Sequence, residues 1–216
     1  MSSTRPLRAD AERNRARILA AASEVFAERG LDVSLDDIAM AAGVGVGTVY
    51  RRFTDKDALI DALFEEKIDR AVELADDALE IEDPWEGLTT FMRGMCRLQA
   101  EDRGFKDALL TRGHGRERVA AARERIAPRA MELLARAQEA GAVRADLGPF
   151  DVPMINLCVG LIADRTRDIA PDYWERILTI LIDGISAKGP TTSMPVEPLD
   201  REAFTEAMAS PRRRRG

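Results

Sequence analysis

The feature that most constrains this chain is a glycine turn, Gly43-Val44-Gly45, between two short stretches with helical spacing. Apolar residues before the turn recur at intervals of three and four positions, so they share one helix face. They are Leu35, Ile38, Ala39 and Ala42. Ser34 and Asp37 form the pattern of a capping box, which predicts a helix from about Leu35 to Ala42. A second short helix is expected from about Val46 to Arg52.

Longer helices are predicted on both sides of this pair. Upstream, an apolar stripe predicts a helix from Asp10 to Arg29 that ends at Gly30. The stripe consists of Ile18, Ala22, Val25 and Phe26. Downstream, Thr54 and Asp57 have the spacing of a second capping box, so a long helix is expected from there to about residue 81.

Helical spacing continues to about residue 187, interrupted by turn residues. The further helices are predicted at about 84–104, 105–110, 115–141 with a bend at Pro128, 151–168 and 172–187. After Lys188, four prolines and an Arg212 to Arg215 run predict a mostly disordered tail, with at most two helical turns around residues 201–208. We therefore expect an all-α fold of about nine helices. Its parts would be a flexible arm (1–9), a three-helix unit containing the helix-turn-helix (10–55), a larger helical domain (56–187) and the tail (188–216).

Composition agrees with an all-helical protein and argues against other classes. Ala, Leu, Arg and Glu dominate, and aromatic residues make up 5% of the chain. The most apolar stretch, Val152 to Ala163, is shorter than a membrane span and contains Asn156, so we expect a cytoplasmic protein without a membrane partner. Cys96 and Cys158 lie far apart without metal-binding spacing, and both are expected to be buried free thiols.

Charge is distributed unevenly along the chain. The net charge is −6, yet residues 1–56 hold nine Lys and Arg against eight Asp and Glu, which leaves −7 for the remainder. A weakly basic head can bind DNA if its cations cluster on one face. Bulk charge alone therefore gives no support to a nucleic-acid partner.

The second short helix has an outward face suited to DNA. Its spacing directs Val49 and Phe53 inwards. The side chains left facing outwards or sideways can donate to phosphates, and they are Thr48, Tyr50, Arg51 and Arg52. Lys56 follows in the first turn of a helix, where the helix dipole disfavours a cation and a phosphate would explain it. Taken singly, each residue fits an ordinary solvated surface equally well.

Together, residues 17–64 resemble the N-terminal domain of the TetR family of transcriptional regulators, without gaps. The shared features are the spacing of Phe26 and Gly30, Ser34 before Asp37-Ile38-Ala39, the Ala42-Gly43-Val44 turn, Gly47-Thr48-Val49-Tyr50, Phe53, and Lys56 before Leu59. The resemblance implies DNA contacts, mostly to phosphates, at Ser34, Gly45, Val46, Gly47, Thr48, Tyr50, Arg51 and Lys56. The family often has polar residues at the positions of Gly45 and Val46. Specificity is therefore expected to rest on a thymine-methyl contact from Val46 or on DNA shape.

Beyond residue 80, only the number and order of helices agree with the family. The resemblance implies that the last two helices form a homodimer interface, with candidates Ile155, Val159, Ile162, Ile177, Leu181, Gly184 and Ile185. It also implies a ligand cavity among the preceding helices. Flexible thioethers and aromatic rings suit such a pocket, although core packing predicts the same residues. The candidates are Phe91, Met92, Met95, Phe105, Leu109, Met131 and the loop histidine His114.

The sequence predicts a DNA-binding transcriptional regulator and not an enzyme, because its one histidine and scattered cysteines offer no recognisable nucleophile, base or metal cluster. No cofactor or metal is expected. The expected partners are a palindromic double-stranded DNA operator, a second copy of the chain and an unknown small-molecule effector that releases the repressor. The alternative is a helical ligand- or partner-binding protein with a weak or vestigial helix-turn-helix. The sequence does not distinguish a repressor from an activator.

Overall fold

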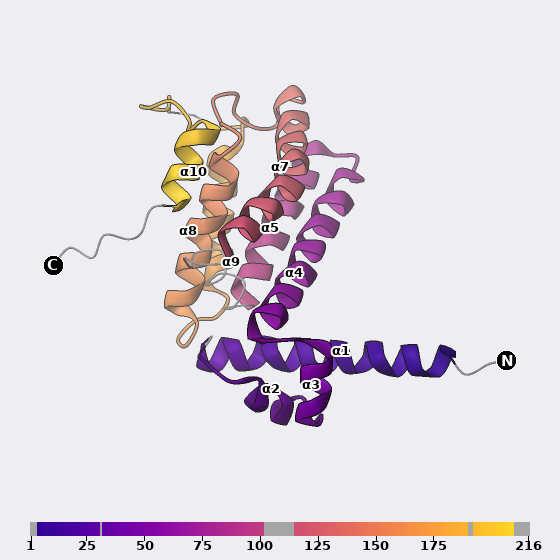
Figure 1. The fold of residues 1–216 in the computed structure, drawn as a ribbon. Coiled ribbons are helices and arrows are strands. Elements are labelled where there is room, and N and C mark those ends of the chain that lie inside the picture. The colour runs from indigo at the N-terminus through magenta and orange to yellow at the C-terminus, as the bar shows by residue number, and fades with distance from the viewer. Residues whose placement is uncertain (1–3, 31, 102–114, 190–191, 210–216) are drawn as a thin grey trace. The chain divides into compact units, whose positions relative to one another are not determined.

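The computed structural model describes residues 4–30, 32–101, 115–189 and 192–209. Within these ranges the chain forms helices and turns, with one isolated antiparallel bridge between Val143 and Ser186 (Figure 1). The helices are α1 (Thr4–Arg29), α2 (Leu35–Ala41), α3 (Val46–Arg52), α4 (Lys56–Leu79), α5 (Pro84–Glu101), α7 (Gly115–Glu139), α8 (Asp151–Thr166), α9 (Tyr173–Ile185) and α10 (Arg201–Ala209). The all-α prediction is confirmed. Among the described residues, no helix is both long enough and apolar enough to cross a membrane.

The chain forms two compact units. The first contains α1, α2, α3 and the part of α4 up to Arg70. The second contains α4 from Ala71 onward, together with α5, α7, α8, α9 and α10. One continuous helix, α4, therefore contributes to both units.

The core of the first unit includes the apolar stripe of α1. Its four predicted members, Ile18, Ala22, Val25 and Phe26, are all buried. The helix begins at Thr4, whereas the sequence predicts a start at Asp10 after a flexible arm. Residues 4–13 contain several strong helix formers, and Arg13 forms an ion pair with Asp10 one turn earlier. Both features favour continuing the helix through these residues.

The cap of α4 is Asp55. Its Oδ1 atom accepts a hydrogen bond from the backbone nitrogen of Ala58 at 2.8 Å, while the Thr54 hydroxyl donates to Asp55 Oδ2 at 3.4 Å. The predicted Thr54–Asp57 capping box is therefore wrong by one position. Adjacent Thr and Asp residues both suit an N-cap, so the sequence pattern alone could not choose between them.

Two other predicted helix boundaries are confirmed. Asp83 caps α5, because its Oδ1 atom accepts hydrogen bonds from the backbone nitrogens of Trp85 and Glu86 at 2.8 and 3.0 Å. Gly141 follows the end of α7 with a φ of +65°, in the left-handed region that favours glycine after a helix.

The core of the second unit is built from α4, α5, α7, α8 and α9. Its fully buried side chains include Leu88, Met92, Leu133, Val159 and Leu178. Two arginines of α7 hold the end of α4. Arg136 donates to the backbone oxygens of Leu79 and Ile81 at 2.5 and 3.0 Å, and Arg129 forms an ion pair with Asp76. The Arg136 bonds satisfy carbonyl groups that a helix end leaves without intrahelical partners.

The described part of the tail packs on the second unit, whereas the sequence predicts a mostly disordered tail. Phe204 in α10 is buried and stacks on Phe150 with ring centroids 4.7 Å apart and an interplanar angle of 20°. Pro198 approaches Gly148 so closely that a Cβ at residue 148 would lie 2.3 Å from the Pro198 Cβ. Figure 1 shows α10 beside α8. These contacts join segments far apart in the sequence, so no local pattern predicts them.

Candidate nucleic-acid interface

The helix-turn-helix begins with a double hydrogen-bonded cap at Ser34. Ser34 Oγ accepts from the backbone nitrogen of Asp37 at 3.1 Å, and Asp37 Oδ2 accepts from the backbone nitrogen of Ser34 at 3.0 Å. The Ser34 hydroxyl also donates to Asp37 Oδ2 at 2.5 Å. The side-chain bond first, and then the backbone bond, lower the pKa of Asp37 below its ordinary value of 3.8. The predicted capping box is confirmed, and a phosphate that takes the Ser34 hydroxyl proton must compete with Asp37.

The turn between α2 and α3 is held from α1. Gly43 has a φ of +61°, a conformation that favours glycine. Arg17 in α1 donates through Nη2 to the backbone oxygens of Ala42 at 2.8 Å and Gly43 at 3.3 Å. A cation at the C-terminal end of α2 satisfies free carbonyl groups and is favoured by the helix dipole. The sequence analysis missed Arg17, because a bond across 25 residues leaves no local pattern.

One face of α3 is buried and the other is exposed. Val49 is fully buried, and Phe53, the residue that ends the helix, is nearly so, as predicted. On the other side, Val46 and Tyr50 expose 42% and 51% of their surfaces. The packing of Val49 and Phe53 therefore fixes α3 on the first unit and leaves its opposite face open.

Cationic side chains lie on α3 and at the start of α4. Arg51 Nη2 donates to Thr48 Oγ1 at 3.1 Å, which orients the guanidinium along α3. Arg52 is exposed, and Lys56 is half-buried in the first turn of α4. The eight predicted DNA contacts thus occupy the cap of α2, the cap and body of α3, and the first turn of α4.

Two glycines of this segment have space around them. A Cβ at Gly47 would meet no atom within 4 Å, and a Cβ at Gly45 would come no closer than 3.9 Å to Thr48 Oγ1. Neither residue has a positive φ. Glycine inside a helix costs up to about 1 kcal/mol relative to alanine. At Gly47, neither internal packing nor backbone conformation accounts for that cost.

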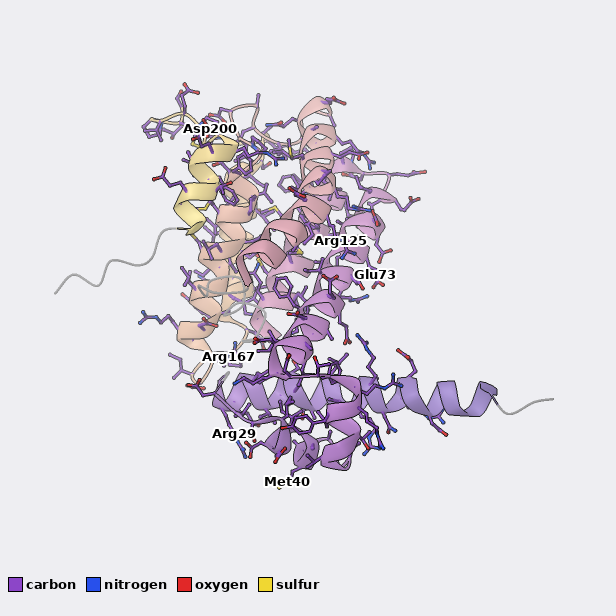
Figure 2. The ribbon with its side chains drawn as sticks, in the orientation of Figure 1. Arg29, Met40, Glu73, Arg125, Arg167 and Asp200 are labelled. Atoms are coloured by element: carbon purple, nitrogen blue, oxygen red, sulfur yellow. The ribbon has the colours of Figure 1, made fainter. Side chains whose placement is uncertain are left out.

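Met40 is an exposed residue that the sequence analysis did not single out. It lies on α2, exposes 73% of its surface, and projects outwards in Figure 2. Its position was available from the sequence, since the buried face of α2 is set by Leu35, Ile38 and Ala39 and residue 40 falls outside it. Met40, Val46 and Tyr50 give α2 and α3 three exposed large apolar side chains.

The predicted ligand-binding residues fall into three groups. Phe91, Met92 and Met95 lie on α5, and all three are buried in the core of the second unit. Met131 lies on α7 with an exposed side chain, so it does not join them in the core. Phe105, Leu109 and His114 lie outside the described residues. Core packing requires the same burial of the three α5 side chains, and their role in ligand binding stays a prediction.

The predicted dimer-interface residues lie on α8 and α9. Val159 and Ile185 are buried within the chain's own core, and Ile155 and Leu181 are half-buried against it. Ile162 and Ile177 are also half-buried, while Gly184 is exposed with open space where a Cβ would stand.

The structure adds further residues to this exposed surface. Ile180 exposes 57% of its surface and Tyr173 exposes 44%, and both share helical spacing with Ile177 on α9. Cys158 on α8 is exposed, contrary to the prediction that both cysteines are buried, whereas Cys96 is buried as predicted. The helix containing Cys158 is apolar on most sides, so the sequence does not reveal which side lacks a neighbour.

Comparison with known proteins matches both parts of the chain. Residues 18–63 match the family model of the bacterial regulatory proteins of the tetR family, and residues 83–187 match the C-terminal domain of SbtR-like transcriptional regulators. A crystal structure of a TetR transcription regulatory protein from Mycobacterium vanbaalenii is 40% identical, covers 84% of this chain and 99% of that one, and has a TM-score of 0.63. The chain belongs to the TetR family.

Other TetR-family relatives agree. A TetR regulator structure from Streptomyces coelicolor is 30% identical and covers 81% of this chain and 99% of that one, with a TM-score of 0.61. An HTH-type transcriptional regulator of Staphylococcus aureus is 38% identical over 84 residues, which cover 38% of this chain and 44% of that relative. The chain thus matches less than half the length of this curated relative. At the level of the family, the prediction of a regulator rather than an enzyme is confirmed.

Proposed function

We propose that this TetR-family protein is a cytoplasmic repressor that binds a palindromic operator as a homodimer and is released by a small-molecule effector. Residues 10–55 would form the DNA-binding domain, and residues 56–187 the ligand-binding and dimerisation domain. The observation that carries the DNA-binding proposal is Gly47. A glycine that the protein does not need for its own packing fits a helix whose backbone must come close to a duplex.

The remaining DNA contacts are assigned by chemistry. Tyr50, Arg51 and Lys56 donate to phosphates, while Thr48 and Ser34 add hydroxyl groups near the two helix starts. Gly45 and Gly47 allow close approach, and Val46 meets a thymine methyl group at the edge of a base pair. Its 42% exposure at the first position of α3 supports this assignment.

The homodimer is proposed from the exposed apolar side of α8 and α9. Tyr173, Ile177, Ile180 and Gly184 are spaced along one side of α9. Burying that side against a second copy removes its apolar surface from water, and Gly184 lets two helices approach closely. A two-fold axis through this surface presents two copies of α3 to successive major grooves, which requires a separation of about 34–36 Å.

Release is proposed to act through α4. Its C-terminal part packs in the core of the second unit, where Phe91, Met92 and Met95 lie, and its N-terminal part belongs to the first unit. An effector that binds only one arrangement of α4 shifts the population towards it. Operator affinity then falls because the spacing of the two α3 helices changes.

The DNA-binding proposal is tested by selecting sequences from a random duplex library and measuring their affinity by fluorescence anisotropy at several salt concentrations. A selected palindrome should bind far more tightly than a scrambled duplex. The logarithm of its association constant should fall with the logarithm of salt concentration by about 0.9 per phosphate contacted. Tyr50→Ala and Lys56→Ala should weaken binding without unfolding the protein. Absence of any enriched sequence would favour the alternative of a vestigial helix-turn-helix.

The dimer is tested by analytical ultracentrifugation of Ile180→Asp. This substitution places a charge on the proposed interface and should shift the protein from dimer to monomer. Ile169→Asp is the matched control, because Ile169 is 84% exposed between α8 and α9 and belongs to neither helix. A dimer that survives Ile180→Asp would refute the assigned surface.

A further inference from the structure

A neutral polar seam crosses the apolar core of the second unit between α5 and α8. On α5, Cys96 and Gln99 are one turn apart, and on α8, Asn156 and Gly160 are one turn apart. Cys96 Sγ donates to Asn156 Oδ1 at 3.3 Å. One turn further along both helices, Gln99 lies against Gly160, where a Cβ would stand 2.6 Å from Gln99 Oε1.

The Gln99 amide is unusual within this seam. The residue is only 8% exposed, and in the part of the chain that the structure describes no hydrogen bond to its amide is found. A buried amide without a partner costs free energy, because it has given up its bonds to water. The absence of a side chain at Gly160 makes room for the amide. Space is thus kept for a polar group whose bonds the described chain does not supply.

The surroundings of this amide define what it can recognise. Met92, Met95 and Val159 supply buried apolar surface on the same two helices. The polar groups of the seam are two amides and one thiol. Burial raises the pKa of the Cys96 thiol to about 12, so the thiol carries no charge at neutral pH. A charged ligand group placed here would be buried without a counter-charge from these groups.

We infer that Gln99 and Asn156, with the space left by Gly160, form the polar recognition site for the effector, and that the effector is a mainly apolar, uncharged molecule with an amide-like or hydroxyl hydrogen-bonding group. The inference rests on the effector control proposed above. It adds three residues that the sequence analysis did not consider. An amide both donates and accepts, so Gln99 and Asn156 are suited to a neutral group that does the same.

The test uses three probes with the same alkyl chain: octanamide, octanoate and octylamine. Each is titrated into the full-length protein at pH 7.5 by isothermal titration calorimetry. Octanamide should bind at least tenfold more tightly than either charged probe, because only the charged probes bury an unpaired charge. Gln99→Met keeps the size of the side chain and should weaken octanamide binding roughly two- to tenfold, the range for one neutral hydrogen bond.

Two further variants separate recognition from packing. Gly160→Ala keeps Gln99 but displaces its amide, so it should weaken octanamide binding as Gln99→Met does. Thr89→Val is the control, because Thr89 is another buried polar residue of α5 whose hydroxyl donates to Glu86 in the same helix. It should leave octanamide affinity unchanged. Thermal melts verify that each variant is folded.

The inference is overturned if octanoate binds as tightly as octanamide, if folded Gln99→Met keeps wild-type affinity, or if no probe binds. Affinity for the selected operator is measured in the same samples. Operator binding without octanamide binding would overturn this inference alone. Octanamide binding that depends on Gln99 but leaves operator affinity unchanged would support the site and contradict the proposed regulation.

Discussion

The guanidinium of Arg17 and the backbone carbonyl of Ala42 are joined by a 2.8 Å hydrogen bond that ties α1 to the end of α2. The same nitrogen lies 3.3 Å from the Gly43 oxygen, so one side chain holds both residues that begin the turn. Since α3 follows directly, Arg17 is a positioning residue: it acts on DNA binding through the turn.

Arg17→Met is expected to weaken operator binding while leaving its salt dependence unchanged. The substitution removes the two hydrogen bonds and keeps the apolar stem, so unfolding should become easier by about 1 kcal/mol. Anisotropy titrations at several salt concentrations give both the affinity and the slope. A smaller slope would mean that Arg17 contacts a phosphate, and wild-type affinity would mean that the turn does not depend on it.

Gly47→Ala should change stability and DNA binding in opposite directions. The new methyl group meets no protein atom, and helix propensity predicts a gain of up to about 1 kcal/mol in the free energy of unfolding. The same methyl group obstructs the duplex, and Gly47→Val should weaken binding further. Denaturant melts and operator titrations of the same samples provide the comparison. Gly43→Ala is the contrast, because its φ of +61° makes it destabilising.

The cap at Ser34 should make stability depend on pH in the acid range. The pKa of Asp37 is lower in the folded protein than its ordinary value of 3.8, so its contribution is present above that value and is lost as the pH falls through the lower folded pKa. Asp37→Asn should therefore be less stable than wild type at pH 6, and the difference should shrink below pH 3.8.

The measurement is denaturant unfolding of both proteins between pH 6 and pH 3. Asp36→Asn is the control, because it removes an equal charge in the same turn but no bond to Ser34. An equal pH dependence in both variants would show that charge alone, and not the capping box, is responsible.

Phe204→Ala should release α10 from the second unit. Its stack on Phe150 is the described aromatic contact of the tail, and the loss should be about 2 kcal/mol, less than the 3–5 kcal/mol typical of Phe→Ala in a closed core, because the helix can detach. Hydrogen exchange of amides 201–209 should become faster. Glu206→Ala alters an exposed position of α10 and should leave exchange slow. Unchanged exchange in Phe204→Ala would show that other contacts hold the tail.

Features that depend on neighbouring residues could be predicted from the sequence. The Ser34–Asp37 cap, the start at Asp83 and the inward faces of Val49 and Phe53 follow from residues a few positions apart. The cap at Asp55 was missed because Thr54 satisfies the same rule. The contacts of Arg17, Phe204 and Gln99 were missed for a different reason. Each joins elements that the folded chain alone brings together, and none leaves a periodic signal.

Because α4 belongs to both units, its helical phase is information that the chain must preserve. Each residue of an α-helix turns the chain by about 100° and advances it by about 1.5 Å. A single insertion near Arg70 would therefore rotate everything attached beyond it, even if both units remained intact. Chimeric regulators that exchange heads and bodies between relatives would have to join their parts in register within α4, and recombination in this family is constrained at that point by geometry as well as by stability.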